Sequence, residues 1–205
     1  MSTVQEQDGM PSLPDSGRLE ALLDAALGVF MRFGYRKTSM QDIADAAQIS
    51  RQGLYLHFAA KEQLFRAVVE HAMRRAELAA QRALETPDLE QGLVSAFDAW
   101  MGDFIGLGSA VASDLREIGP TLIGPMAAEY DARFHQVLAR RIAASPLTPM
   151  LEPLALTPAQ LAVMLHAVAR GHKHSATSRE QFRTLIGDAV RVMCAPLLLQ
   201  HTRTA

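Results

Sequence analysis

Apolar side chains recur at three- and four-residue intervals along most of this 205-residue chain, the spacing that places them on one face of an α-helix. The first such stripe runs from Leu19 to Phe33 and stops at Gly34, which suits the end of a helix because glycine adopts left-handed backbone conformations without strain. No segment shows the alternation of a half-buried strand. The pattern predicts an all-α protein of about nine helices without internal repeats.

Three further helices are predicted in the N-terminal part of the chain. The second follows residues 38–41, Thr-Ser-Met-Gln, which have the form of a capping box, a hydroxyl followed three residues later by an amide. The third begins at the N-cap residue Ser50 and runs to about residue 58. The fourth begins at Lys61 and is expected to end near residue 84, before Thr-Pro-Asp at 86–88.

The rest of the chain is also predicted to be helical. A stripe over residues 93–104 is followed by helices at about 109–117 and 120–144 and by a proline-rich connector at 145–153. Capping-box sequences at 157–160 and 178–181 then predict the last two helices, over about 158–172 and 178–195.

The N-terminal residues and the single cysteine give expectations about location. Residues 1–17 contain two prolines, two glycines and no apolar period, so we expect a flexible tail. They lack the basic start and apolar run of a secretion signal, and no segment holds about 18 uninterrupted apolar residues. Cys194 has no partner for an internal disulfide, which suits a reducing compartment. These features predict a cytoplasmic protein that does not span a membrane.

The net charge of −2 hides an uneven distribution along the chain. Residues 18–75 carry nine basic and six acidic side chains, so the acidic excess lies elsewhere. A local basic excess of this size is a weak indication of phosphate binding, because ordinary surfaces reach it by chance.

Residues 39–58 have the length and pattern of a helix-turn-helix, a short helix, a tight turn and a second helix that begins polar and ends apolar. In such a motif the start of the second helix meets base edges in the major groove. Here that start is Ser50, Arg51, Gln52 and Gly53. Arginine pairs with guanine and glutamine with adenine, while glycine allows close approach of the backbone.

The segment YRKTSMQDIADAAQISRQGLYLHFAAKEQLF resembles the DNA-binding region of TetR/AcrR-type transcriptional regulators. The resemblance covers about residues 18–75, and its motif elements are Thr38, Asp42-Ile43-Ala44, Ala46-Ala47, Ser50, Leu54-Tyr55, His57-Phe58, Lys61-Glu62 and Leu64-Phe65. It implies a DNA-binding domain at 18–63 and a larger ligand-binding and dimerisation domain at 64–205.

The resemblance also implies roles for single residues. Thr38, Tyr55, His57 and Lys61 would contact phosphates, Arg51 and Gln52 would face bases, and Leu54 and Phe58 would be core. Two positions depart from the family pattern. Gln48 occupies a turn position where glycine is usual, at a cost of about 1 kcal/mol if its backbone is left-handed. Ala60 replaces a polar cap before Lys61, which leaves the fourth helix less well capped.

For the C-terminal domain the resemblance implies a homodimer in which the last two helices of each chain form a four-helix bundle. Their apolar faces consist of Leu161, Met164, Leu165, Val168, Phe182, Leu185, Ile186, Ala189 and Met193, although packing within one chain could use the same faces. Candidate residues for an effector pocket are Trp100, Phe104, Met126, Tyr130, Phe134 and Met164, for which ordinary core packing is the alternative.

Enzymatic activity has no positive support in the sequence. His166, His172 and His174 lack the neighbouring cysteines or carboxylates of a zinc site, and a polar helix end explains them better. No catalytic motif and no requirement for a cofactor or metal is indicated. The sequence therefore predicts a ligand-responsive regulator, most readily a repressor released from double-stranded operator DNA by a small molecule. The alternatives are a small-molecule binding protein without an operator, a metal-dependent all-α enzyme using these histidines, and an activator.

Overall fold

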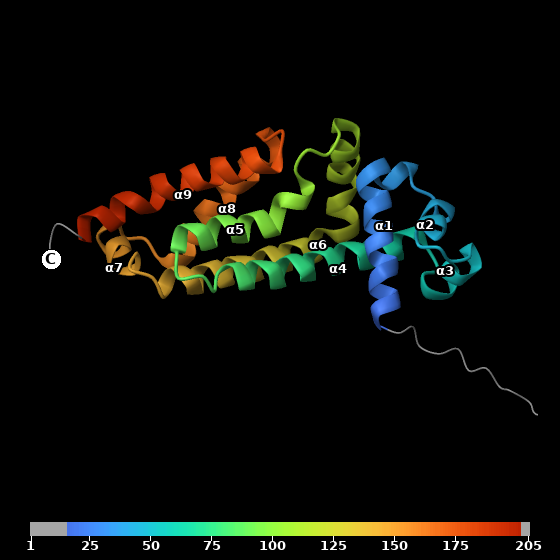
Figure 1. Cartoon of the computed structure of the whole chain (residues 1–205), viewed down its shortest axis with the longest axis horizontal. Helices are drawn as coiled ribbons and strands as arrows, with labels where there is room; N and C mark the ends of the chain where they lie inside the picture. The colour runs from blue at the N-terminus through green and yellow to red at the C-terminus, as the bar shows by residue number, and fades with distance from the viewer. Residues whose placement is uncertain (1–15, 202–205) are drawn as a thin grey trace, which may run out of the picture. The chain divides into compact units, whose positions relative to one another are not determined.

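The computed structural model describes residues 16–201, and every regular element among them is helical (Figure 1). The α-helices are α1 Ser16–Lys37, α2 Met40–Ala46, α3 Arg51–His57, α4 Lys61–Ala83, α5 Leu89–Met101, α6 Ser109–Ala143, α7 Thr148–Leu151, α8 Pro158–Ser175 and α9 Arg179–His201. Two short 3-10 helices, η1 Gly102–Phe104 and η2 Glu152–Leu154, complete the described chain. The prediction of an all-α fold with about nine helices is confirmed over this range.

The predicted N-terminal tail falls mostly outside the described residues. Residues 1–15 of that tail lie outside them, whereas Ser16 and Gly17 already belong to α1. The described chain forms two compact units, which meet in sequence between His71 and Ala72 within α4. The boundary predicted between residues 63 and 64 lies in the same helix.

The first unit packs α1, α2, α3 and the start of α4 around a small aromatic core. The Phe65 ring meets those of Phe30 and Tyr35 edge-on, with both centroid distances at 5.0 Å. Ile43 of α2 and Leu54 of α3 are fully buried and hold the two short helices to this core. At Gly34, where the sequence predicted the end of the helix, the backbone leaves the helical conformation (φ 81°), but helical residues resume after this kink as far as Lys37.

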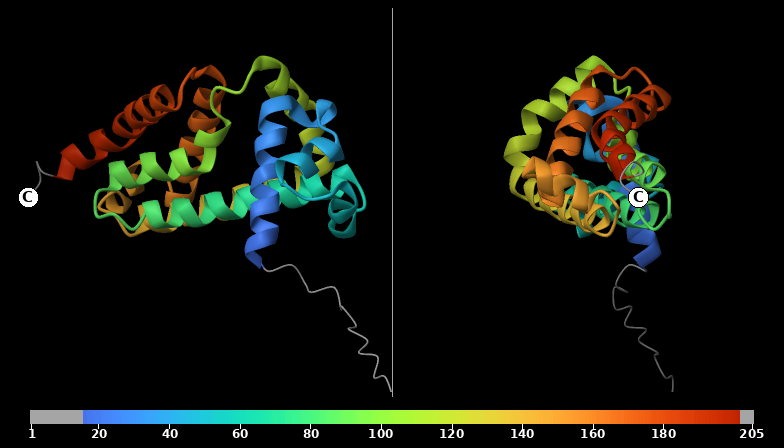
Figure 2. Two further views of the ribbon diagram at one scale, coloured as in Figure 1. Left: turned by 45° about the vertical axis from the view of Figure 1, so that its right-hand side comes forward. Right: turned by 90° about the vertical axis from the view of Figure 1, so that its left-hand side faces the viewer.

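The second unit is built on two helix pairs, α6 against α8 and α5 against α9 (Figure 2). Its core includes the parallel rings of Trp100 and Phe134, whose centroids lie 4.4 Å apart. The two helices predicted at about 109–117 and 120–144 are one helix, so that prediction is wrong. Pro120 and Pro125 lie inside α6, where each removes one backbone donor, and such a helix can bend and continue (Figure 1).

The caps of the last two helices follow from local sequence. Thr157 Oγ1 accepts a hydrogen bond from Gln160 N, and Gln160 Oε1 accepts one from Thr157 N, which confirms the predicted capping box. Before α9, Ser178 Oγ accepts from Gln181 N at 3.1 Å. The Gln181 side chain accepts from Thr177 N rather than from Ser178, so that box closes one residue earlier than predicted.

Within residues 16–201 no single helix is long and apolar enough to span a membrane. The pair Thr148–Leu154 and Pro158–Ser175 meets the length and composition together, but the two segments are bent by 89°.

Candidate DNA-binding surface

The first helix of the motif, α2, is capped by Ser39 rather than by Thr38. Ser39 Oγ accepts from Asp42 N at 3.2 Å, and Asp42 Oδ2 accepts from Ser39 N at 2.8 Å. A further hydrogen bond from the Ser39 hydroxyl lowers the pKa of Asp42. The capping box predicted on Thr38 and Gln41 is therefore one residue too early, because the Thr38 hydroxyl is buried and donates to Gly34 O at 2.6 Å.

The turn between α2 and α3 contains a left-handed backbone conformation at Gln48, the position where glycine is usual in the family. Gln48 has φ 56°, which confirms the left-handed backbone considered from the sequence, a region that glycine favours and that strains a residue with a Cβ. Gln48 N donates to Asp45 O at 3.2 Å and Ile49 N donates to Ala44 O at 3.0 Å. These hydrogen bonds close the turn and set the direction in which α3 begins.

The second helix, α3, starts at the predicted N-cap. Ser50 Oγ accepts from Gly53 N at 2.9 Å, and a Cβ added to Gly53 would lie 3.1 Å from that oxygen. Because Gly53 has no side chain, it leaves room for the Ser50 hydroxyl that caps the helix, and it would also allow the backbone of α3 to approach a groove closely. At the other end of α3, Phe58 is only partly buried, so it contributes to the core less fully than predicted.

The exposed side of α3 carries the polar residues that the sequence predicted for DNA. Arg51, Gln52, Tyr55 and His57 are all exposed, while Leu54 on the opposite side is fully buried. The Arg51 guanidinium lies over the Tyr55 ring, 5.6 Å from its centroid. Leu56 is exposed on the same helix and is not among the residues predicted from the sequence, although its position one helical turn after Gln52 would have indicated it.

Thr38 and Lys61 are brought together, but both make contacts within the protein. Lys61 Nζ donates to Tyr35 O at 3.0 Å and to Thr38 O at 2.9 Å. An ammonium group has three donors, so one remains for a phosphate. The Thr38 side chain, 2% exposed and already donating to Gly34, supports the α1–α2 junction rather than presenting a donor to solvent. The absence of a polar cap at residue 60 is offset by Gln63, whose side chain accepts from Ala59 N at 3.2 Å.

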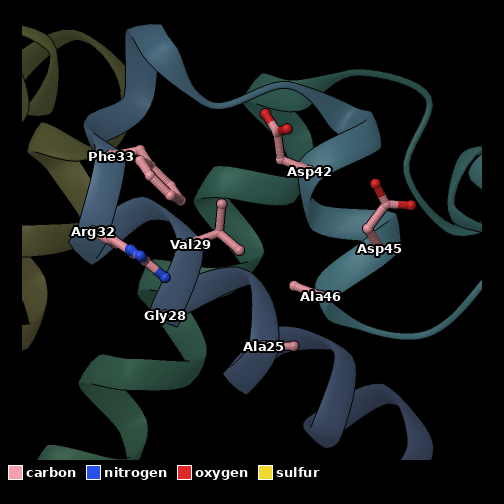
Figure 3. Close-up of a pocket in the computed structure, with 8 residues that line it drawn as sticks. All are labelled: Ala25, Gly28, Val29, Arg32, Phe33, Asp42, Asp45 and Ala46. Atoms are coloured by element: carbon pink, nitrogen blue, oxygen red, sulfur yellow. The ribbon is translucent and has the colours of Figure 1, made fainter.

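A cleft of about 400 Å³ lies between α1 and α2 (Figure 3). Asp42 and Asp45 line it from α2, opposite Arg32 and Phe33 of α1, with the remaining lining given by Ala25, Gly28, Val29 and Ala46. Two carboxylates repel a phosphate, so this cleft is not suited to the DNA backbone.

None of the predicted effector-pocket residues lines the cleft between α1 and α2 or the cavity beside α5 and α9 described below. Trp100, Tyr130 and Phe134 are buried in the core of the second unit, whereas Met164 is 44% exposed. Met126 packs against that core, and the Phe104 ring lies 4.8 Å from Lys173 Nζ. A cavity of about 510 Å³ is lined by residues of α5 and α9 and by the N-cap residue of α5. The lining residues are Asp88, Glu90, Gln91, Val94, Ser95, Arg183, Thr184, Gly187 and Arg191.

Four of the predicted dimer-interface residues are buried in the core of their own chain, which leaves them almost no surface for contact with a second copy. These are Leu161, Leu165, Phe182 and Ile186, each at most 2% exposed. Met164 is exposed, and Val168, Leu185, Ala189 and Met193 are partly buried. Val163 and Val192 add exposed apolar surface to the same two helices, at 48% and 73%.

The histidines of α8 do not converge on a metal site. Within the described residues no group of three or more His, Cys, Asp or Glu side chains could hold a metal ion. His166 is buried and its Nδ1 lies 2.5 Å from His135 Nε2 of α6, while its Nε2 lies 3.8 Å from Asp131 Oδ1. His174 is exposed at the end of the helix.

The motif and the fold both have matches among known proteins. Residues 22–68 match the family model described as bacterial regulatory proteins, tetR family. The HTH-type transcriptional activator FasR of Mycolicibacterium smegmatis is 38% identical over 94 residues, 45% of this chain and 42% of that protein, so the match spans less than half of this relative. The HTH-type transcriptional repressor ComR of Escherichia coli is 27% identical over 92% of this chain and 93% of its own length. The crystal structure of a TetR transcription regulator from Haloarcula marismortui covers 86% of this chain and 96% of its own, with a TM-score of 0.66 and 17% identity, a likeness of fold.

Proposed function

Because this chain belongs to the TetR family of transcriptional regulators, we propose that it is a homodimeric repressor that binds a specific double-stranded operator and leaves it when a small molecule binds. The observation that carries the proposal is α3, which presents Arg51, Gln52 and Tyr55 to solvent while Leu54 is fully buried. A short helix with one buried and one polar face, held by a tight turn to a bracing helix, fits the major groove.

The proposed contacts divide into two kinds. Gln52 and Arg51 face base edges and give sequence preference, whereas Tyr55, His57 and the Ser50 hydroxyl contact phosphates, and Gly53 keeps the backbone close to the groove. Lys61 offers its one remaining donor to a phosphate near the start of α4, where the helix dipole also favours an anion. Thr38 acts through the backbone that it positions.

Repression is favoured over activation by the extent of the matches. The matched repressor aligns along 92% of this chain, whereas the matched activator aligns along 45%. A small molecule that binds the second unit more tightly in the DNA-free conformation would shift the population away from the operator. The helix α4 belongs to both units and is the segment of chain through which that shift would pass.

We place the dimer contact on the exposed apolar residues of α8 and α9, with Met164, Val163 and Val192 as its most exposed members. Regulators of this family act as dimers, which present two reading helices to half-sites about one DNA turn apart or a multiple of it. The double variant Met164→Glu and Val192→Glu should be monomeric, and light scattering should then give the mass of one chain. Leu154→Glu, an exposed leucine outside these helices, should leave the mass unchanged.

The operator is tested by selecting duplexes from a random pool with the purified full chain and measuring affinity against salt. We expect an enriched sequence, an affinity that falls as salt rises, Gln52→Ala to change the preferred sequence, and Tyr55→Phe to weaken binding to all sequences. Equal binding to every duplex, or none, would refute the proposal. Candidate effectors are then screened for release of the operator and for a change in fluorescence of Trp100, the single tryptophan, which is 9% exposed in the core of the second unit.

A further inference from the structure

Leu56 is 82% exposed, the largest exposed fraction among the large apolar side chains of the described chain. A single exposed leucine is common on protein surfaces and requires no explanation by itself. Its position on α3 is what matters, because this helix is the proposed reading element and every other exposed side chain on it carries a polar group, the Tyr55 hydroxyl included.

Helix geometry shows which residues of α3 point furthest from the core. An α-helix turns about 100° per residue, so Gln52 and Leu56 both lie about 160° from the fully buried Leu54, on either side of the direction opposite to it. Arg51 and Tyr55 lie nearer the core, at about 60° and 100° on one flank. The contact between the Arg51 guanidinium and the Tyr55 ring agrees with this placement. The edge of α3 that enters a groove first is therefore formed by Gln52 and Leu56.

The chemistry of an aliphatic side chain at that edge limits what it can recognise. Leucine has no donor or acceptor, so it gains nothing from phosphates or from the hydrogen-bonding groups of bases. The one apolar group that the bases present in the major groove is the 5-methyl group of thymine. We propose that Leu56 contacts a thymine methyl in the operator and so adds a requirement for thymine to the sequence preference, an inference that rests on the proposed function.

The expected position of this thymine follows from the spacing of the two residues. Four residues of helix rise about 6 Å, close to the separation of two base-pair steps. For a helix lying along the groove, the thymine is expected within about two base pairs of the base that Gln52 contacts. Glutamine prefers adenine, so we expect the half-site to contain an adenine and a thymine at this separation.

Replacement of thymine by deoxyuridine tests the proposal, because it removes the methyl group and keeps every hydrogen-bonding group. The duplex selected by the wild-type chain is resynthesised with each thymine replaced in turn. One position in each half-site should lose about fourfold in affinity, the value of one buried methyl group. Leu56→Ala should bind the thymine duplex more weakly and should be insensitive to the replacement at that position, whereas Leu56→Met should remain sensitive.

The matched control is Leu154→Ala, which removes an exposed leucine outside the reading helix and should keep the full sensitivity. Since Leu56 is exposed, its substitution should not change the helix content or the unfolding midpoint, and circular dichroism checks this. A Leu56→Ala protein that loses as much affinity as the wild type at every replaced thymine would overturn the inference. Sequence-specific binding with no methyl-sensitive position overturns the inference alone, whereas absence of duplex selection contradicts the proposed function first.

Discussion

The Lys61 ammonium lies 4.4 Å from the centroid of the Tyr35 ring and donates a hydrogen bond to the carbonyl oxygen of the same residue at 3.0 Å. A second hydrogen bond reaches Thr38 O at 2.9 Å. Lys61 thus ties the start of α4 to the junction of α1 and α2, so a residue proposed to bind phosphate is also part of the framework of the DNA-binding unit.

Replacement of Lys61 should therefore lower stability as well as DNA affinity. Lys61→Met keeps the apolar stem but removes two charge-assisted hydrogen bonds and the cation–π contact, and it should reduce the free energy of unfolding by about 1–3 kcal/mol. Urea denaturation followed by circular dichroism measures this. Lys37→Met, at an exposed position near the end of α1, should change it by less than about 0.5 kcal/mol. Equal stability of the two variants would contradict the framework role.

Gln48 offers a stabilising substitution. Because its φ of 56° is strained for a residue with a Cβ, Gln48→Gly should raise the free energy of unfolding by about 0.5–1 kcal/mol, after the greater freedom of glycine in the unfolded chain is subtracted. Gln48→Ala retains the Cβ and should give no such gain. Urea denaturation of the three proteins makes the comparison, and a glycine variant no more stable than the alanine variant would refute the strain.

Asp98 holds α5 to α9 by accepting hydrogen bonds from two arginines. Asp98 Oδ1 accepts a hydrogen bond from Arg179 Nε at 2.7 Å, and Asp98 Oδ2 accepts one from Arg183 Nη1 at 2.7 Å. The Asp98 residue is only 8% exposed. The Asp98 hydrogen bond is also the main reason why the pKa of Arg179 is raised. Asp98→Asn should reduce the free energy of unfolding by about 2 kcal/mol, because two guanidinium groups then face a neutral amide.

The control for Asp98 is Asp188, whose ion pair with Arg191 is exposed on α9. Asp188→Asn should cost less than about 0.5 kcal/mol, since solvent already screens that pair. Thermal or urea unfolding compares the two variants. Similar losses of unfolding free energy for both would show that burial of Asp98 adds nothing to the strength of its ion pairs.

His166 should make stability depend on pH. Burial lowers its pKa from 6.5 to about 4, with Asp131 opposing the shift and His135, Arg170 and Lys173 adding to it. As the pH is lowered, His166 of the unfolded chain therefore binds a proton near pH 6.5, whereas His166 of the folded chain binds it only near pH 4. The free energy of unfolding should fall as pH is lowered through this window, by up to about 1.4 kcal/mol per pH unit.

Urea denaturation at several values of pH tests this dependence. His166→Gln should flatten the slope between pH 6.5 and pH 4, whatever its effect on absolute stability. His174→Gln, on the exposed end of the same helix, should keep the slope of the wild type. Identical slopes for the wild type and His166→Gln would contradict the prediction.

Local sequence determined the features that depend on residues within about four positions of one another. Most of the helices are of this kind, although α6 continues through two prolines where a break was predicted. The caps at Ser50 and Thr157 and the left-handed turn at Gln48 are also of this kind, because a cap or a turn is completed by its immediate neighbours. The polar face of α3 also follows from local spacing around Leu54. The shift of one capping box from Thr38 to Ser39 shows the limit, since burial of Thr38 depends on the packing around it.

Only the tertiary structure decided which apolar faces are used within the chain. Leu161 and Phe182 belong to stripes that look the same whether the helix packing against them is in the same chain or in a second copy, and the structure places both in the core of one chain. The partners of Lys61 and of Asp98 lie more than 20 residues away in sequence, at separations where spacing carries no information about contact. The sequence therefore determined α3 and its exposed polar face, while the fold determined what supports this helix and which surfaces remain exposed.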